Sequence, residues 1–105
     1  MIARGDVFDG DLGEHGRRPC VVVTRSLAIP VLTRLNVVLV TSTIRGHAAE
    51  VEIDERHGLE HASAANCDMI VNIRKDRLVR RRGALDPETL RLLNTALKVA
   101  LGLDG

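Results

Sequence analysis

Aromatic residues are almost absent from this chain: Phe8 is the only one among 105 residues, and neither Trp nor Tyr occurs. Aromatic rings usually supply much of the buried area of a core. Here the core has to be built from Val, Leu, Ile and Ala. The basic parts of the chain also lack the rings on which single-stranded bases stack. The absence therefore predicts a core that depends on aliphatic packing.

Cysteine is equally scarce. Cys20 and Cys67 both lie in apolar sequence, and no short Cys-X-X-Cys spacing accompanies them. Such spacing would be expected of a zinc site or a redox pair. We therefore expect two buried free thiols.

Long apolar runs are missing as well. No segment approaches the roughly 18 apolar residues that a membrane-spanning helix requires. The N-terminus has no basic stretch followed by an apolar run, which would be typical of a signal peptide. We therefore expect no membrane association and a place in the cytosol. A length of 105 residues fits one domain over 1–105.

Neither sign of charge dominates, because the formal net charge is only +1. The distribution is uneven: six of the nine residues in 74–82 are basic, and acidic residues gather between positions 50 and 60. A basic stretch of this kind can attract a polyanion by neutralising phosphates. A solvated surface and a docking site for an acidic partner are equally consistent with it.

Alternating and β-branched segments predict a mainly β fold before the last 20 or so residues. The expected strands are 5–11, 19–25, 35–44, 50–54 and 66–73. The strand at 19–25 should be buried on both faces, and the longest, 35–44, should be central. The segment 26–34 is expected to be a loop, and 74–78 a short turn.

Two of these strands carry predictions about individual side chains. In 50–54 the period-two alternation places Val51 and Ile53 in the core and the carboxylates of Glu50 and Glu52 in water. In 66–73 the same alternation places four side chains on one face: Cys67, Met69, Val71 and Ile73.

The last part of the chain begins with residues that are typical of a helix N-terminus. Asp86 is a suitable N-cap and Pro87 suits the first helical position. Leucines recur beyond it at helical spacing, at positions 90, 93, 97 and 101. A broad apolar face of this kind must pack on the sheet or on a partner.

Histidines are the first candidates for chemistry, because a pair of them can act as general acid and base on RNA. His57 and His61 are four residues apart, but the intervening Gly58 makes a shared helical face doubtful. We expect a structural or solvated role for both, and no familiar metal-ligand spacing is present. His15, close to an arginine pair, is the histidine most worth testing.

Arginines and hydroxyls are the second group. Arg17 and Arg18 precede the apolar strand, where a loop is expected to enter it, and arginine presents a rigid fork of donors that fits a phosphate. Thr41, Ser42 and Thr43 end the central strand, and Arg45 follows them. Taken locally, a surface arginine and hydroxyls that satisfy a strand edge are the simpler interpretations.

Taken together, several segments have the order and character of one known family. They are Arg4-Gly5-Asp6-Val7-Phe8, Gly16-Arg17-Arg18-Pro19-Cys20-Val21-Val22-Val23, Val37-Val38-Leu39-Val40-Thr41-Ser42-Thr43-Ile44-Arg45-Gly46, Val51-Glu52-Ile53, Gly58-Leu59, Ser63, Cys67-Asp68, Arg77-Leu78 and Ala100-Leu101-Gly102-Leu103. In this succession the chain resembles the MazF/PemK toxins of type II toxin–antitoxin systems over nearly its whole length.

The resemblance implies a small SH3-like β-barrel with a C-terminal helix, a homodimer, and a cognate antitoxin as partner. It also implies an endoribonuclease that cuts single-stranded RNA without a metal or other cofactor, leaving a 2′,3′-cyclic phosphate and a 5′-hydroxyl. The catalytic residues of the family fall on Arg18 and Thr41. Further RNA contacts are expected at Arg17, Ser42, Thr43, Arg45, Glu14, His15 and Arg74.

The chain also departs from the family pattern. The loop over 10–17 is short, and Glu14-His15 stands where relatives carry Glu-Gln. Leu39 replaces a proline, and Met69-Ile70-Val71 replaces Gln-Ile-Arg. RNA contacts are therefore expected to have moved, with Arg74 as one replacement, or the activity to be altered. Base preference cannot be transferred from relatives.

Two other functions fit the same fold. A CcdB-like poison would grip DNA gyrase and cleave nothing, and an inactive scaffold would keep only antitoxin binding. A gyrase binder has no need of Arg18 together with Thr41, whereas Val71 in place of the family's arginine favours the scaffold.

Overall fold

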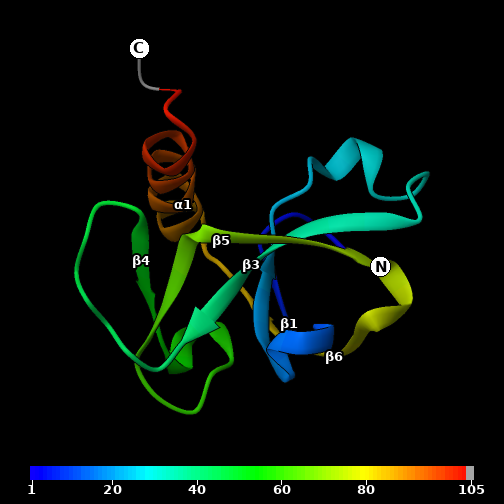
Figure 1. Ribbon diagram of the computed structural model, residues 1–105, viewed down its shortest axis with the longest axis horizontal. Coiled ribbons are helices and arrows are strands. Elements are labelled where there is room, and N and C mark those ends of the chain that lie inside the picture. The colour runs from blue at the N-terminus through cyan, green and yellow to red at the C-terminus, as the bar shows by residue number, and fades with distance from the viewer. Residues whose placement is uncertain (104–105) are drawn as a thin grey trace.

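In the part of the chain that the structure describes, six antiparallel strands form one sheet that curls into a half-barrel, and one α-helix follows them (Figure 1). The computed structural model describes residues 1–103. The strand order is β4-β5-β3-β2-β1-β6, so β4 and β6 form the two edges. The bounds are β1 Asp6–Asp11, β2 Arg17–Val22, β3 Arg34–Thr41, β4 Glu50–Ile53, β5 Ser63–Arg74, β6 Leu78–Ala84 and α1 Pro87–Leu101. The expected mainly β fold with a C-terminal helix is confirmed.

The interior is aliphatic and lies on both faces of the middle strands. Successive residues of a strand point to opposite faces. Val38 of β3 therefore packs in a cluster that reaches Leu93 of α1. Val37 and Leu39 pack with Phe8 in a second cluster on the other face. The prediction of a strand buried on both faces also holds for β2.

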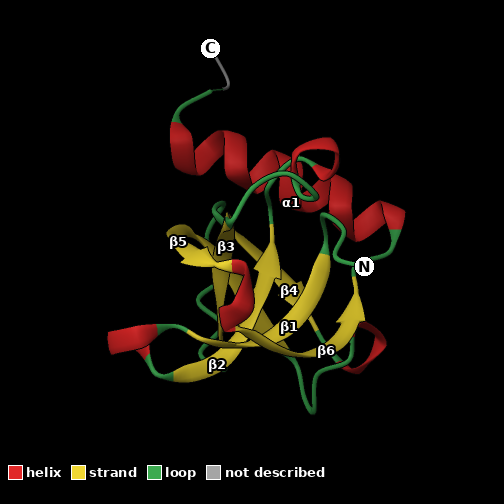
Figure 2. Ribbon diagram, turned by 90° about the vertical axis from the view of Figure 1, so that its right-hand side faces the viewer, coloured by secondary structure: helices red, strands yellow, loops and turns green. Residues whose placement is uncertain are grey.

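The helix α1 lies across one end of the curled sheet (Figure 2). Asp86 caps it, because its side chain accepts a hydrogen bond from the Thr89 backbone N–H at 3.2 Å. Gly102 ends it in the left-handed conformation. Leu93 and Ala96 are buried against the sheet. The predicted N-cap and apolar face are confirmed, and the sheet is what that face packs on.

His57 ties the start of this helix to the β4–β5 connection. It is 1% exposed. Its Nδ1 accepts the Asp54 N–H at 3.0 Å, and its Nε2 lies 3.0 Å from Asp86 Oδ1. The Thr89 hydroxyl donates to the same oxygen at 2.6 Å. The hydrogen bonds from Thr89 and then from His57 hold the pKa of Asp86 well below its usual range. His57 therefore has a structural role, as expected.

The boundaries of β2 and β3 differ from the prediction. The hairpin with β1 pairs Arg17 with Asp11 and Arg18 with Gly10, so β2 begins before Pro19. Both arginines consequently lie within the strand and not in a loop that leads into it. β3 ends at Thr41, three residues before the predicted end.

The basic stretch contains a strand that the sequence pattern did not indicate. β6 is an edge strand paired only with β1, which lets its side chains face solvent and carry charge. Acidic residues of β1 pair with arginines in and beside it: Arg77 with Asp11, Arg80 and Arg82 with Asp9, and Arg81 with Asp6.

β5 does not present one continuous face. Val38 pairs with Ile70, but its neighbour Leu39 pairs with Asn66, so the register shifts sharply between them. The strand changes direction there, as Figure 1 shows. Cys67 is buried while Met69, beyond the register shift, is 37% exposed, so the prediction that they lie on one face is wrong.

Both cysteines are buried free thiols, as expected. Burial, together with the charge of Asp9, raises the pKa of the Cys20 thiol to about 12. Burial and the nearby Asp68 raise the pKa of the Cys67 thiol to about 11. Both side chains consequently behave as small apolar groups.

Candidate active site

Three strands bring separate parts of the sequence to one end of the sheet. Cys20 of β2 lies opposite Leu39 of β3. Arg18 and Thr41 are each two residues further toward the same end, and the alternation of side chains places them on the same face. Thr41 in turn lies opposite Ala64, next to the start of β5. The sheet register thus explains why positions 18, 41 and 61–63 meet.

An open depression of about 290 Å³ occupies this meeting point. Its lining residues are Arg18, Pro19, Val40, Thr41, Ser42, His61 and Ser63. Arg18 and Thr41, which the family resemblance implies are catalytic, therefore line one depression within a single chain.

The Arg18 side chain is half-buried and fixed by the backbone of β3. Its Nε and Nη2 donate to the Val40 carbonyl oxygen at 3.3 and 2.8 Å. A guanidinium has five N–H donors, so three remain for a ligand. Because the group is held before any ligand arrives, it can bind two phosphate oxygens without reorganising.

Hydroxyl groups of Thr41 and Ser42 also line the depression. Thr41 Oγ1 accepts the Thr43 backbone N–H at 3.1 Å, which leaves its own proton free to be donated. Ser42 is exposed and lines the same depression. Thr43 and Arg45 are exposed on the β3–β4 connection and lie outside its lining.

Glu50 holds that connection in place. Its carboxylate accepts the backbone N–H groups of Arg45 and Gly46, both at 2.9 Å, and its side chain is 3% exposed. Burial raises the pKa of Glu50, but these two hydrogen bonds together with the charges of His47 and Arg45 outweigh it, so the pKa is lowered. The prediction of a carboxylate in water is wrong for Glu50, because the connection folds back over it, and correct for Glu52.

The loop before β5 is anchored to β6 by a close backbone contact. Gly58 has φ +93°, and a side chain on it would collide with the Arg82 carbonyl. Arg82 is largely buried and donates to the Gly58 carbonyl at 3.1 Å and to Asp9 at 2.9 Å. This arginine is therefore structural, although the sequence grouped it with the exposed basic stretch.

His61 is carried by this anchored loop and was not among the predicted site residues. It lines the depression described above and a neighbouring one of about 350 Å³ that also contains Arg17 and Arg18. Its Nδ1 lies 3.0 Å from the Ala62 carbonyl oxygen. No local pattern marks it, because the pairing of β5 with β3 is what brings it beside Arg18.

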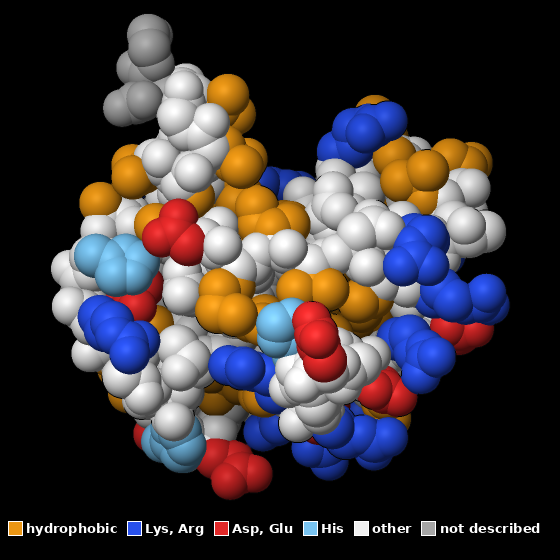
Figure 3. Space-filling model, in the orientation of Figure 1, with side chains coloured by type: hydrophobic (Ala, Val, Ile, Leu, Met, Phe, Trp, Pro, Cys, Tyr) orange, Lys and Arg blue, Asp and Glu red, His pale blue; other side chains and the backbone are white. Residues whose placement is uncertain are grey.

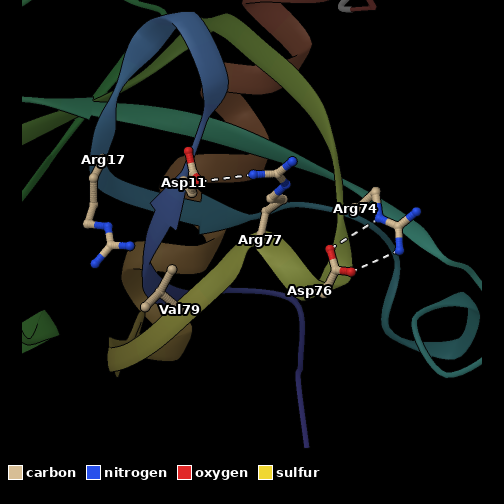
Figure 4. Close-up of a pocket in the computed structure, with 6 residues that line it drawn as sticks. All are labelled: Asp11, Arg17, Arg74, Asp76, Arg77 and Val79. Atoms are coloured by element: carbon tan, nitrogen blue, oxygen red, sulfur yellow. Dashed lines mark hydrogen bonds and ion pairs between the residues drawn. The ribbon is translucent and has the colours of Figure 1, made fainter.

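The other predicted RNA contacts lie farther out. Arg74 pairs with Asp76 at 2.8 Å and lines a larger depression, of about 570 Å³, together with Arg17 and Arg77 (Figure 4). Glu14 and His15 belong to the short 3₁₀ helix Gly13–His15 and line neither depression that contains Arg18. Arg17 thus links the two regions, whereas Arg74, Glu14 and His15 do not join the Arg18 site.

Positive charge gathers beside the site. Figure 3 shows Lys and Arg side chains concentrated where β6 and the β5–β6 connection lie. Several of them are more than half exposed: Arg74, Arg77, Arg80 and Arg81. Each of these four arginines also pairs with an aspartate. A basic surface of this kind can attract polyanions in a salt-dependent way.

Two further features concern residues 1–103 only. No three His, Cys, Asp or Glu side chains in this part of the chain are grouped so that they could hold a metal ion. No helix in it combines the length and apolar character needed to cross a membrane.

Comparison with known proteins supplies the family. The sequence model of the family described as "PemK-like, MazF-like toxin of type II toxin-antitoxin system" matches residues 3–101 of this chain. "Probable endoribonuclease MazF5" of Mycobacterium tuberculosis is 41% identical over 96% of this chain and 94% of its own length. The solved "Mycobacterium tuberculosis toxin MazF-mt6" superposes with a TM-score of 0.88 at 32% identity, covering 95% of this chain and 99% of that one. The structure "Endoribonuclease in complex with its cognate antitoxin from Mycobacterial species" gives 0.88 at 30% identity, with 100% and 99% covered. The chain therefore belongs to the PemK-like, MazF-like toxins of type II toxin–antitoxin systems, the family that its sequence resembles.

Proposed function

We propose that the protein is an endoribonuclease that cuts single-stranded RNA without a metal, at a phosphodiester held between Arg18 and Thr41. The observation that carries the proposal is that both side chains line one depression, with the guanidinium already oriented by the Val40 carbonyl. The relatives named as endoribonucleases support the same activity.

In the proposed reaction the substrate supplies the nucleophile. The ribose 2′-oxygen attacks the adjacent phosphorus, the bond from phosphorus to the 5′-oxygen breaks, and the products are a 2′,3′-cyclic phosphate and a 5′-hydroxyl. The three free N–H donors of Arg18 stabilise the negative charge that builds up on the non-bridging oxygens. The Thr41 hydroxyl donates to one of these oxygens, and Ser42 lies beside it. Losing one preorganised donor typically lowers a rate by about 10²–10³.

The flanking nucleotides are proposed to follow the positive surface. Arg17 lines both the Arg18 region and the depression with Arg74, which supports a path from one to the other. The remaining proposed contacts with RNA are Glu14, His15, Thr43 and Arg45. Such a path depends mainly on phosphate neutralisation, so RNA binding should weaken steeply with salt.

The test is cleavage of a long synthetic RNA by purified protein in EDTA. We expect Arg18→Ala to cut at least about 10²-fold more slowly. Arg18→Lys should also be slower than the unaltered protein, because an ammonium lacks the planar fork. Arg91→Ala, a change at an exposed position of α1, is the matched control and should cut normally. Cleavage that needs added Mg²⁺, or an Arg18→Ala variant as fast as the control, would refute the proposal.

We also propose a cognate antitoxin as partner, with both proteins in the cytoplasm. A neighbouring solved structure is described as bound to its cognate antitoxin, which supports such a partner here. An acidic, partly disordered antitoxin segment would compete for the same positive groove. Saturating antitoxin should therefore abolish RNA binding measured by fluorescence anisotropy. Undiminished RNA binding would exclude a shared groove.

A homodimer is the proposed assembly. Several large apolar side chains are exposed, among them Leu27, Val31, Leu92 and Val99. Apolar surface of this kind is commonly covered by a partner. Sedimentation equilibrium should give twice the mass of one chain, and a monomer at micromolar concentration would contradict the dimer.

A further inference from the structure

The proposed cleavage needs a group that takes a proton from the 2′-hydroxyl. Arginine stays protonated in proteins, so Arg18 cannot take it, and the Thr41 hydroxyl is a donor in the scheme above. Of the seven residues that line the depression, all within the described chain, His61 alone carries an imidazole, the side chain most often used as a general base.

We propose that His61 is the general base of the reaction, with Nε2 accepting the proton of the attacking 2′-hydroxyl. This inference rests on the proposed function and adds to it a catalytic residue on a third segment of the chain. It gives the site a division of roles: charge stabilisation by Arg18, oxygen binding by Thr41 and proton transfer by His61.

The hydrogen bonds of the imidazole ring favour this role. Nδ1 lies 3.0 Å from the Ala62 carbonyl oxygen, which can only accept, so Nδ1 carries the ring hydrogen. The Ser63 hydroxyl lies 3.3 Å from the same nitrogen and donates its own proton to the His61 carbonyl. Within residues 1–103 Nε2 has no hydrogen-bond partner. Its lone pair is therefore available on a ring that is fixed from the other side.

The loop that carries His61 is fixed as well. The backbone contact between Gly58 and Arg82 anchors the loop to β6, and Ser63 begins β5, so both ends are held. A base must come within hydrogen-bond reach of its proton, and a loop held at both ends limits how far the ring can drift. The charged groups that line the two depressions together with His61 are Asp9 of β1, Arg17 and Arg18 of β2, Glu60 of the same loop and Arg82 of β6.

Atoms and charges balance in the step. The 2′-oxygen gives its proton to Nε2 as it bonds to phosphorus, and the 5′-oxygen departs with the electrons of the broken bond and takes a proton from water. The imidazolium then returns its proton to solvent. Overall the bond from phosphorus to the 5′-oxygen is replaced by one to the 2′-oxygen, and no water is consumed.

The experiment compares the unaltered protein with His61→Gln in single-turnover cleavage of one RNA, in EDTA, from pH 5 to 8. The unaltered rate should rise with pH, because only neutral imidazole accepts a proton. His61→Gln should be slower by about 10²–10⁴-fold and nearly independent of pH. His47→Gln, at an exposed histidine on the β3–β4 connection outside the depression, is the matched control.

Two further measurements separate catalysis from binding and folding. RNA blocked by a 2′-O-methyl group at the mapped cleavage position should bind His61→Gln as tightly as it binds the unaltered protein. Free imidazole should restore cleavage to His61→Ala, which a merely structural role would not allow.

The outcomes are distinct. If the unaltered protein cleaves and His61→Gln cleaves equally fast, or loses only affinity for the blocked RNA, the base is not His61 although the nuclease proposal stands. A rate of the unaltered protein that falls as the pH rises would also overturn a base at this position. No cleavage by the unaltered protein would refute the proposed function, and His61 as its base with it.

Discussion

Replacing Gly58 by alanine tests whether the contact between the His61 loop and β6 is as close as the structure requires. Gly58 has φ +93°, a conformation that costs an alanine about 1–2 kcal/mol. The added carbon would also overlap the Arg82 carbonyl and lie 2.9 Å from the Gly83 nitrogen. Because these are backbone atoms, relief requires the strand or the loop to move, at an overpacking cost of about 1–3 kcal/mol. The free energy of unfolding should fall by about 2–5 kcal/mol.

Gly46→Ala is the control that separates the two effects. Gly46 also has a positive φ, +73°, but a carbon added there meets nothing within 4 Å. It should show only the conformational cost. Urea unfolding followed by circular dichroism measures the free energy of unfolding of each variant. In thermal unfolding, Tm should be at least about 4 °C lower for Gly58→Ala than for Gly46→Ala. Equal losses in the two variants would show that the loop does not press on β6.

Three further predictions concern the core, the thiols and the helix cap. Leu93→Ala should lower the free energy of unfolding by about 2–5 kcal/mol because Leu93 is fully buried, whereas Arg91→Ala, at an exposed position of the same helix, should change it by less than about 0.5 kcal/mol. Cys20 and Cys67 should resist a thiol reagent at pH 8 in the folded protein and react once it is unfolded, because burial raises the pKa of both; fast labelling of native protein would contradict this. Asp86→Asn keeps a capping side chain but removes its charge, so it should lower Tm at pH 7. The difference should shrink below about pH 4, because a carboxyl whose folded pKa is lowered stabilises above its unfolded pKa and stops doing so as the pH falls. A difference that is the same at pH 7 and pH 3 would contradict the lowered pKa.

The elements that could best be predicted from the sequence are those in which the spacing of apolar residues indicates which face is buried. The β-branched runs of β2 and β3 and the leucine spacing of α1 are such cases, because a strand or helix between two apolar layers needs apolar residues at fixed intervals. The start of α1 at Asp86 and Pro87 could be predicted because helix capping is an interaction between residues close in sequence.

What the sequence could not predict depends on pairing between distant segments. β6 carries exposed arginines because it is an edge strand, so its composition resembled that of a basic loop. The register shift in β5 separates Cys67 from Met69, which strict alternation placed together.

The site divides in the same way. Arg18 and Thr41 were identified through the family resemblance, and the register of β2 with β3 explains why they meet. The sequence predicts a structural or solvated role for His61, because no local pattern shows that it lines the same depression as Arg18, 43 positions earlier in the chain. Arg74, the expected replacement for the cation missing at Val71, lies in a different depression, paired with Asp76.

A structure of the protein bound to RNA that is blocked by a 2′-O-methyl group at its cleavage position would show which side chains hold the scissile phosphate. We expect this phosphate to lie within hydrogen-bond distance of the Arg18 guanidinium and the Thr41 hydroxyl. A scissile phosphate bound instead in the depression of Arg17, Arg74 and Arg77, with Arg18 and Thr41 untouched, would contradict this expectation.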